Sequence, residues 1–381
     1  FFCFSTPIID FIEKYRPQKS HVRHKHAPNV GYLQPELDIT QQHTEYCREN
    51  PDTSCSYELF RQVVHDLHIS FARLGKEECS TCHLLSGAEK EEHLKEARRR
   101  RKSYEKDAER ATRLVYTADL QKVSMLPRME MFKEAAFCRR LVALNHSFVP
   151  AGGSAPTKPV VANIWHEAIA GRTASEMATS MLVFLTNDAL PEADKITIWL
   201  DNCSYQNKNY LLFQAMQAAV ENGDVPFNEV EFRYFVAGHS FMAADSYHSR
   251  IEAEFKKMEV VLNFRDFSAA CRSADKNCVT NSLRYDQFLA FPDDRSSSLI
   301  GKSSTTISQI CAAKFSRGSP QIMVKDTWRG LWKAFRFLKR DVNLVPLSSL
   351  DQLREAPRGI GKRKKKDIQK TLLPLFLNFR D

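Results

Sequence analysis

No stretch of this sequence approaches the ~18 consecutive apolar residues that a membrane-spanning helix needs. Glycine is scarce, with 13 residues in 381, and there is no internal repeat, so a collagen-like chain is excluded. Hydrophobic residues make up 43% and charged residues 27%, which excludes a wholly disordered chain as well. We therefore expect a soluble globular protein of two or three folded units, because domains usually contain ~100–200 residues.

Ten cysteines are spread over the chain, at a density far below that of small disulfide-rich secreted domains. The first residue is Phe1 rather than Met, and no charged and then apolar leader precedes a small-residue cleavage site. We therefore expect no signal peptide, and a fragment of a longer protein is compatible with this start. Both observations predict a reduced, intracellular protein.

The one tight cysteine spacing is Cys79-Ser-Thr-Cys82, which is half of a zinc site. His43 and Cys47 are the candidates that would complete a set of four ligands, with Cys55 or His83 as substitutes. Four protein ligands would close the site, so the role of the zinc ion would be structural. The alternative is a pair of unlinked thiols in a loop.

The formal charge of +9 and the pI of about 9.0 predict a polyanionic partner. The last thirty residues, Gln352–Asp381, carry nine Lys or Arg and three Asp or Glu, so +6 of the excess lies there. A second basic block is Arg98–Lys102. Such blocks can contact nucleic acid, but solvated helix faces and targeting signals also contain them. The candidate nucleic-acid-binding residues are Arg98, Arg99, Arg100, Arg101, Lys364, Lys365 and Lys366.

Five segments rich in β-branched, aliphatic and aromatic residues are predicted strands, and three segments with apolar residues at helical spacing are predicted helices. The strands are 113–120, 141–149, 159–165, 195–200 and 229–237, and the helices are 173–186, 209–222 and 246–261. The order β-β-β-α-β-α-β-α predicts a mixed sheet with an antiparallel meander and a parallel half. This is the order of the ribonuclease-H-like fold. We therefore expect an α/β fold with a mixed five-stranded sheet flanked by helices.

The remaining segments predict less regular structure. Residues 1–55 form a polar, histidine-containing N-terminal segment. Residues 56–112 are expected to be helical and to contain the Cys-x-x-Cys zinc knuckle, with a long solvated helix over 89–113. The ribonuclease-H-like core then covers 113–263, and 264–381 form an irregular C-terminal region with a basic tail.

Two predicted strands end at acids, Asp119 and Asp201, and the helix after the fifth strand carries Asp245 and Glu252. In the expected fold the first and fourth strands are neighbours, so their acids face one edge and the helix can bring in a third. Converging carboxylates repel one another and need cations to stay ionised. Mg²⁺ or Mn²⁺ suits hard oxygen ligands in an open site. Two such ions ~3.5–4 Å apart can activate an attacking oxygen and stabilise the leaving oxygen of a phosphodiester.

The identity of the third acid stays open between two residues. We favour Glu252, because it follows an apolar residue and lies one full turn inside the predicted helix. Asp245 is the alternative, and it lies where an N-cap residue would. Any single acid at a strand end is more often a turn or cap residue, so the prediction depends on all three falling where the strand order needs them.

The segment 201–209, Asp-Asn-Cys-Ser-Tyr-Gln-Asn-Lys-Asn, is unusually polar for a junction between a strand and a helix. Amides and a lysine, Lys208, beside a metal-binding acid at a helix N-terminus can position a nucleic-acid backbone, and the same residues can cap the helix. Histidines after the fifth strand could orient a phosphate or a metal-bound water, with a packed or loop histidine as the alternative. The candidates for substrate positioning are Asn202, Gln206, Asn207, His239 and His248.

Three groups of residues form motifs that occur together. They are Thr117-Ala-Asp119-Leu-Gln-Lys122; Trp199-Leu-Asp201-Asn-Cys203 with Gln206-Asn207; and Gly238-His239-Ser-Phe-Met242 with Asp245, His248 and Ile251-Glu252. Together they resemble a large transposon-derived, transposase-like family of animal genomes, over roughly residues 20–370. The Asp-Asn and Ile-Glu pieces also resemble motifs of retroviral integrases. Cys203-Ser-Tyr205 departs from the family by replacing a turn of small residues.

The resemblance implies an acid-triad transposase core that uses two Mg²⁺ or Mn²⁺ ions to cleave DNA or transfer its strands. Asp119, Asp201 and either Glu252 or Asp245 would be catalytic and would hold the metal. DNA is the expected partner and a homo-oligomer a further one, whereas neither a membrane nor a small-molecule substrate is expected. The alternatives are a catalytically silent, domesticated element that binds DNA or protein, and a ribonuclease acting on RNA–DNA hybrids. The Lys362–Lys366 cluster and this substrate predict residence in the nucleus.

Overall fold

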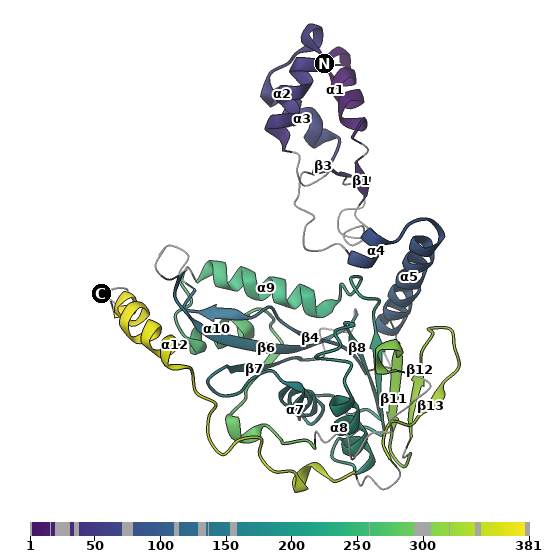
Figure 1. Ribbon diagram of the computed structural model, residues 1–381, viewed down its shortest axis with the longest axis vertical. Coiled ribbons are helices and arrows are strands. Elements are labelled where there is room, and N and C mark those ends of the chain that lie inside the picture. The colour runs from purple at the N-terminus through teal and green to yellow at the C-terminus, as the bar shows by residue number, and fades with distance from the viewer. Residues whose placement is uncertain are drawn as a thin grey trace. The chain divides into compact units, whose positions relative to one another are not determined.

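The computed structural model describes most of the chain, and its residues divide into two units (Figure 1). The units are Phe1–Leu94 and Lys95–Asp381, and the division falls inside one continuous helix, α5 (Gly87–Glu109). The described residues are 2–15, 17–19, 31–33, 38–70, 79–109, 114–128, 135, 137–152, 158–258, 260–292, 306–319, 321–339 and 344–377. No helix among them combines the length and the apolar character of a membrane span.

The first unit is built on a small apolar core that three helices share. The helices are α1 (Phe2–Glu13), α2 (Ile39–Glu49) and α3 (Tyr57–Asp66). Their core side chains are Ile8, Phe11, Ile12, Tyr46, Phe60 and Val64. Asp38 and Ser56 begin α2 and α3 by accepting backbone N–H groups of the first turn. The N-terminal 55 residues, expected to be a polar segment, therefore supply two of the three helices.

Short elements complete the first unit. Three two-residue strands pair with one another, β1 antiparallel to β2 and β2 parallel to β3. A five-residue helix precedes α5. These elements are β1 (Gln18–Lys19), β2 (Gly31–Tyr32), β3 (Ile69–Ser70) and α4 (Ser80–Leu84).

The second unit contains one mixed sheet of ten strands in the order β10-β7-β6-β4-β8-β9-β11-β12-β13, with β5 paired to β6 beside this path. The strands are β4 (Leu114–Leu120), β5 (Ser124–Leu126), β6 (Leu141–Pro150), β7 (Val160–His166), β8 (Lys195–Leu200), β9 (Glu229–Tyr234), β10 (Cys278–Ser282), β11 (Ala312–Ser316), β12 (Ile322–Lys325) and β13 (Lys333–Phe335). β4, β6 and β7 pair antiparallel, whereas β8 runs parallel to β4 and β9 parallel to β8.

The five expected strands are therefore present with the expected meander and parallel half, but the sheet is larger than the five strands predicted. β10 adds to β7 in parallel, and β11, β12 and β13 extend the other edge from β9. These four strands come from the region beyond residue 263 that was expected to be irregular. β10 reads Cys-Val-Thr-Asn-Ser, in which Val279 and Thr280 favour a strand and Asn281 does not. It is a strand because β7 offers it a ladder of backbone hydrogen bonds.

Helices cover both faces of this sheet (Figure 1). α7 (Ala174–Leu185) and α8 (Tyr210–Glu221) bury one apolar core, while α9 (Ala243–Lys257) and α10 (Phe264–Ser273) bury a second on the opposite face. β8 is buried at every position after its first, as a parallel strand covered on both faces should be. The chain continues into α12 (Lys362–Asp367), a π-helical turn (Ile368–Leu372) and α13 (Leu373–Leu377). Single 3₁₀ turns are Pro51–Thr53, Tyr285–Gln287, Ile307–Gln309 and Leu347–Ser349.

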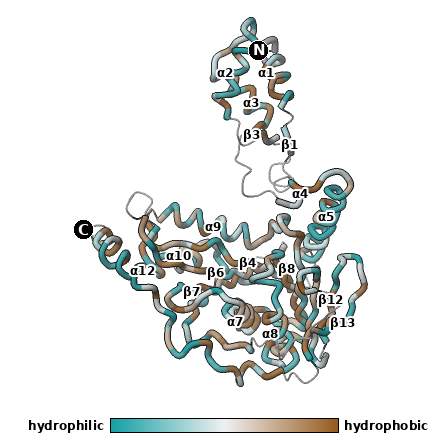
Figure 2. Tube along the Cα trace, viewed as in Figure 1, coloured by the Kyte–Doolittle hydropathy of each residue, from teal (hydrophilic) through white to brown (hydrophobic). Residues whose placement is uncertain are grey.

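The polar helix α5, teal along most of its length in Figure 2, is not solvated throughout. Within the second unit its Asp107 is 4% exposed and accepts hydrogen bonds from Trp199 Nε1 (3.1 Å) and Arg233 Nη1 (2.6 Å). Tyr104 packs edge-on against Trp199. A few polar and aromatic contacts therefore hold the end of α5 on the sheet, and its weak apolar periodicity did not indicate them.

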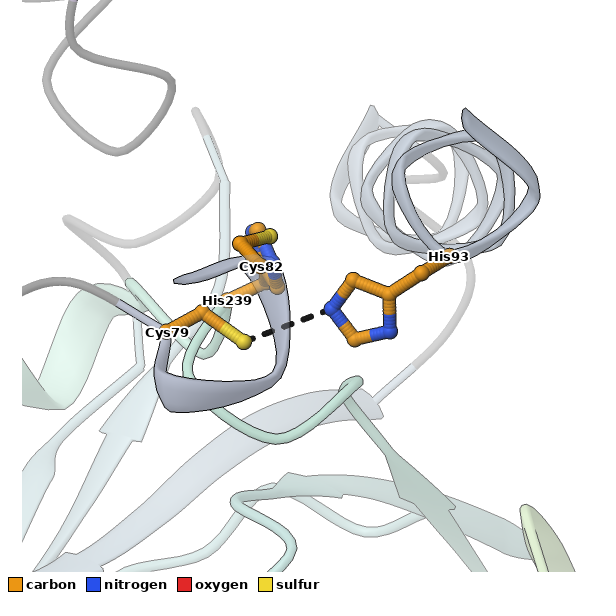
Figure 3. Close-up of side chains that lie close together, drawn as sticks. All are labelled: Cys79, Cys82, His93 and His239. Atoms are coloured by element: carbon orange, nitrogen blue, oxygen red, sulfur yellow. Dashed lines mark hydrogen bonds between the residues drawn. The ribbon is translucent and has the colours of Figure 1, made fainter. Parts of the chain in front are cut away.

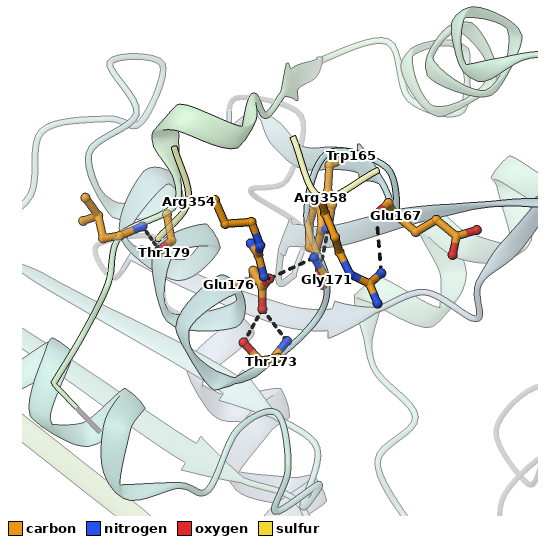
Figure 4. A network of polar contacts seen from close by, with 9 residues as sticks. Trp165, Glu167, Gly171, Thr173, Glu176, Thr179, Arg354 and Arg358 are labelled. Carbon is orange, nitrogen blue, oxygen red and sulfur yellow. Dashed lines mark hydrogen bonds and ion pairs between the residues drawn. The ribbon is translucent and has the colours of Figure 1, made fainter. Parts of the chain in front are cut away.

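A buried acid anchors the C-terminal segment to α7 (Figure 4). The Glu176 carboxylate accepts hydrogen bonds from the backbone N–H groups of Gly171 and Thr173 and from Arg354 Nη2 (2.6 Å). Burial raises the pKa of Glu176, but the hydrogen bonds from Thr173, Arg354 and Gly171 outweigh it, so the pKa lies below its ordinary value. The carboxylate is therefore ionised and fixed at neutral pH.

We predict that Arg354→Leu lowers the free energy of unfolding by about 2 kcal/mol, because it leaves the fully buried Glu176 carboxylate without its cation. This is below the full cost of a broken buried pair, since Arg354 is itself 25% exposed. Urea-induced unfolding followed by circular dichroism measures the loss. The loss of unfolding free energy should shrink as the pH falls below ~4.3, the ordinary pKa of glutamate. The ion pair stabilises the fold only while the Glu176 carboxylate is ionised.

The control for this prediction is Arg358→Leu. Arg358 donates to the Glu167 carbonyl from the same segment and neutralises no buried charge. Arg358→Leu should lower the free energy of unfolding much less than Arg354→Leu does. Equal losses in both variants would show that the ion pair does not anchor the segment.

Candidate functional site

Two acids lie at the same edge of the sheet. Asp119 is in β4, and Asp201 directly follows β8, the parallel neighbour of β4. Ala118 is paired with Leu200, so the two acids occupy the next position on adjacent strands, which are ~5 Å apart. Residues in equal register point to the same face of a sheet. The structure thus brings Asp119 and Asp201 together.

Asp245, near the start of α9, is the third acid beside them. The Ala244 N–H donates to Thr117 Oγ1 (3.0 Å), which ties the first turn of α9 to β4. Asp245 Oδ2 accepts from the Met242 N–H (2.8 Å). Asp245 therefore caps α9 and stands beside the strand acids at the same time, so the two interpretations of this residue do not exclude each other.

The three carboxyl groups affect one another's protonation. Burial is the largest cause that raises the pKa of each, and the pKa of Asp119 lies well above its ordinary value. Repulsion from Asp201 and Asp245 raises the pKa of Asp119 further, and Asp201 raises that of Asp245. Three acids that hinder each other's ionisation form a site that is short of positive charge. Hard oxygen donors of this kind fit Mg²⁺ or Mn²⁺.

Glu252, the residue favoured from the sequence, does not join this group. It lies seven residues after Asp245 on α9, or ~10 Å further along the helix axis. Its side chain is 46% exposed and is paired with Arg128 Nη1 at 2.9 Å. The helix also begins at Ala243 instead of residue 246, which puts Asp245 in the first turn. The structure therefore brings Asp245, not Glu252, to the two strand acids.

The loop after β8 holds Asp201 in place. Asp201 Oδ1 accepts hydrogen bonds from the Cys203 N–H (3.2 Å) and from Asn207 Nδ2, and the Asn207 carbonyl accepts one from Tyr234 Oη (2.8 Å). Among the described residues these donors all use Oδ1, which leaves Oδ2 available to a ligand. Asn207 is thus a positioning residue for the acid. Asn202 and Gln206 lie half-buried in the same loop, without a hydrogen bond to Asp201 from any described atom.

Lys208 is the cation of this loop, expected from the sequence to lie beside the metal-binding acid. It is 4% exposed, its Nζ donates to the Ser308 carbonyl (3.2 Å), and it lies 4.6 Å from the centre of the Tyr234 ring. Burial is the main cause that lowers the pKa of Lys208 to about 8, with Arg100 adding to it. The charge on Lys208 in turn lowers the pKa of Asp201 and partly offsets the effect of burial there.

His248 lies beside the acids, one turn after Asp245 on α9. Its Nδ1 is 3.6 Å from Asp119 Oδ2, and its Nε2 is 3.1 Å from Ser147 Oγ in β6. Burial lowers the pKa of His248 to about 4, so the ring is neutral at pH 7. His239, the other candidate histidine, lies in the turn between β9 and α9, where its backbone N–H donates to the Val236 carbonyl.

The basic block of α5 does not form one exposed patch. Arg98 is exposed, but Arg99 and Arg100 both pair with Glu96, and Arg100 also donates to the Tyr234 carbonyl. Arg101 lies over the ring of Phe235, 5.0 Å from its centre. Burial lowers the pKa of Arg101, whereas Tyr104 and Asp245 raise it. Arg101 therefore places a positive charge near the third acid, a role that the charge run alone did not indicate.

Of the candidate C-terminal lysines, one is in an ion pair and two are exposed. Lys364 pairs with Glu167, and Arg139 pairs with Asp367 (3.0 Å). These two ion pairs fix α12 on the second unit. Lys365 and Lys366 are exposed on α12 and remain candidates for contact with a polyanion.

A group of Cys and His side chains lies in the first unit (Figure 3). Cys79 and Cys82 begin α4, and His93 is on α5. The donor atoms of these three residues lie within 4.8 Å of one another, and Cys79 Sγ is 3.3 Å from His93 Nε2. This group could hold a metal ion. His239, also drawn in Figure 3, belongs to the second unit.

The structure does not give His43 and Cys47 the expected role beside Cys79 and Cys82. They are one turn apart on α2, with Cys47 Sγ 3.4 Å from His43 Nε2, and the same Nε2 is 2.8 Å from the Cys55 carbonyl oxygen. His93, and not His43 or Cys47, lies beside Cys79 and Cys82. Ten residues separate it from Cys82, and no short spacing in the sequence links the two.

A family model described as a domain of unknown function, DUF7869, matches residues 170–287. The match contains Asp201 and Asp245, whereas Asp119 and the Cys and His group of the first unit precede it. No curated protein and no solved structure matches the chain significantly.

We predict that Asp119→Asn raises the unfolding temperature of the protein in a buffer without divalent ions. The wild-type carboxylate is half-buried and is repelled by Asp201 and Asp245, so its ionisation at neutral pH costs folding free energy that the neutral amide does not. Thermal unfolding in the presence of a chelator measures the gain. It should shrink as the pH falls through the raised pKa of Asp119, because the wild-type group then becomes neutral as well.

The matched control is Asp275→Asn. Asp275 is paired with Arg250 at 2.9 Å, outside the group of acids. Its substitution should leave the unfolding temperature unchanged or lower it slightly. A destabilised Asp119→Asn protein would show that the three acids do not repel one another in the folded state.

Proposed function

We propose that the protein is a metal-dependent enzyme that cleaves DNA phosphodiester bonds or transfers DNA strands, with Asp119, Asp201 and Asp245 as its metal-binding acids. The observation that carries this proposal is the convergence of three half-buried carboxyl groups, from β4, the end of β8 and the start of α9, in which Asp201 and Asp245 raise the pKa of Asp119 and Asp201 raises that of Asp245. A protein retains such repulsion where a function needs it, because like charges held close together cost stability.

The chemistry follows from the donor set. Asp119 and Asp201 would share one Mg²⁺ or Mn²⁺ ion, and Asp245 would help to hold the second. Two bound ions supply the activation of an attacking water or 3′-hydroxyl and the stabilisation of the leaving oxygen. The residues of the chain hold the metal-binding carboxylates in position. Asn207 and the Cys203 N–H fix one oxygen of Asp201 and leave the other to the metal.

Neighbouring groups set the environment of the acids. His248 is neutral at pH 7, so it can accept or donate a hydrogen bond at Nδ1 beside Asp119 without adding charge. Ser147 holds its other ring nitrogen. Arg101 and Lys208 add positive charge on the side of Asp245 and Asp201, which favours a polyanionic substrate.

The arrangement of the sheet supports a ribonuclease-H-like core for this chemistry. Three antiparallel strands are followed by two parallel ones, in the order β7-β6-β4-β8-β9, with Asp119 in β4 and Asp201 directly after its parallel neighbour β8. The motifs that resemble the transposon-derived, transposase-like family contain these same acids. We propose DNA as the substrate, a homo-oligomer as the working form and the nucleus as the compartment, supported by the charge of +9 and the exposed lysines of α12.

The test is cleavage of labelled DNA by the full chain in Mg²⁺ or Mn²⁺. Asp201→Asn and Asp245→Asn should each lower the rate by about a thousandfold or more, because the loss of a metal ligand removes several kcal/mol of transition-state stabilisation. Glu252→Gln is the matched control from the same helix. It should keep most of the activity, because Glu252 pairs with Arg128 away from the acids.

Two outcomes would overturn the proposal. If Glu252→Gln lost activity while Asp245→Asn kept it, the assignment of the third acid would be wrong. If the wild type and Asp201→Asn bound DNA equally and neither cleaved it, the protein would be a silent DNA-binding module. An RNA–DNA hybrid cleaved in place of DNA would make the protein a ribonuclease with the same acids.

A further inference from the structure

We propose that Cys79, Cys82 and His93 bind a zinc ion that holds α4 to the beginning of α5. This site is separate from the three acids, and its ion would be structural. The proposal does not depend on nuclease activity, and it assigns to His93 a role that no spacing in the sequence suggested.

The cysteine pair is arranged to share one ion. Cys79 is the N-cap residue of α4 and Cys82 is at the third helical position. Side chains at these two positions of a helix reach toward each other, as the hydrogen bonds of a capping box show. Both thiols are buried, at 2% and 3% exposure, yet neither belongs to the apolar core that α1, α2 and α3 form in this unit. Apolar packing in that core therefore does not explain their burial.

His93 approaches the same point from the next helix. α4 ends at Leu84 and α5 begins at Gly87, where a φ of 54° reverses the chain with a residue that tolerates it. His93 Nε2 thereby comes to 3.3 Å from Cys79 Sγ. A tetrahedral ion with Zn–S of ~2.3 Å and Zn–N of ~2.0 Å would separate these two atoms by about 3.5 Å. The observed separation needs only a small adjustment.

The donor set selects the metal. Two thiolates and an imidazole favour zinc over Mg²⁺ or Mn²⁺, which prefer carboxylate and water oxygens. Zinc is four-coordinate in such sites, and these three residues supply three of the four ligands. The ion has a clear structural use here. α4 has five residues and exposes Leu84 at 82%, so an ion shared with α5 would stabilise a helix too short to be stable by itself.

The experiment measures metal in the purified full chain by mass spectrometry. The wild type should contain about one zinc ion per chain. Cys82→Ser should contain far less, and His93→Ala should bind zinc at least tenfold more weakly in a competition with a chelator, because even the loss of a second-shell partner costs 10–100-fold. Cys138→Ser and His65→Ala are matched controls that should keep the zinc, since neither residue is in the group.

Cobalt substitution gives a second readout that does not require a stable apo protein. Co²⁺ bound to the wild type should show a thiolate charge-transfer band that Cys82→Ser weakens, and His93→Ala should change its visible bands. Asp201→Asn should keep the zinc and the cobalt spectrum, which separates this site from the proposed catalytic one. A wild type without zinc, or equal zinc content and affinity in wild type, Cys82→Ser and His93→Ala, would overturn the proposal.

Discussion

The repulsion between three half-buried carboxyl groups is the constraint on which the functional interpretation depends. Asp119 cannot move away from Asp201, because β4 and β8 are registered neighbours in a sheet buried on both faces. Asp245 cannot move away either, because the Ala244 N–H ties the first turn of α9 to Thr117. The fold therefore holds the acids together at a cost in stability, and a divalent cation is the simplest group that would remove this cost.

The sequence predicted the centre of the sheet because its strands carry their own signal. Buried strands such as β8 are runs of β-branched, aliphatic and aromatic residues, and the acids at their ends stood out against them. The third acid could not be identified in this way. Helical periodicity shows which side of a helix is apolar, but it does not show where α9 begins, nor that Arg128 from a distant segment pairs with Glu252.

The other differences between expectation and structure have similar physical causes. β10 has only two strand-favouring residues, Val279 and Thr280, in five, which is too short a signal to predict a strand that β7 completes by pairing. His93 meets Cys79 across the link between α4 and α5, in which Gly87 has a φ of 54°, and no sequence spacing encodes that contact. The basic block of α5 did contain a usable signal. Consecutive residues of a helix point ~100° apart, so the four arginines 98–101 cannot all lie on one face of the helix.

The two metal sites proposed for this chain would use different ligand atoms. The acids at the sheet edge offer oxygen, whereas the residues of α4 and α5 offer sulfur and nitrogen. The most direct measurement of the central claim is anomalous diffraction from a crystal of the full chain soaked in Mn²⁺. It should give manganese density bounded by the carboxylates of Asp119, Asp201 and Asp245. Ordered manganese elsewhere on the protein with none among these three side chains would contradict the claim.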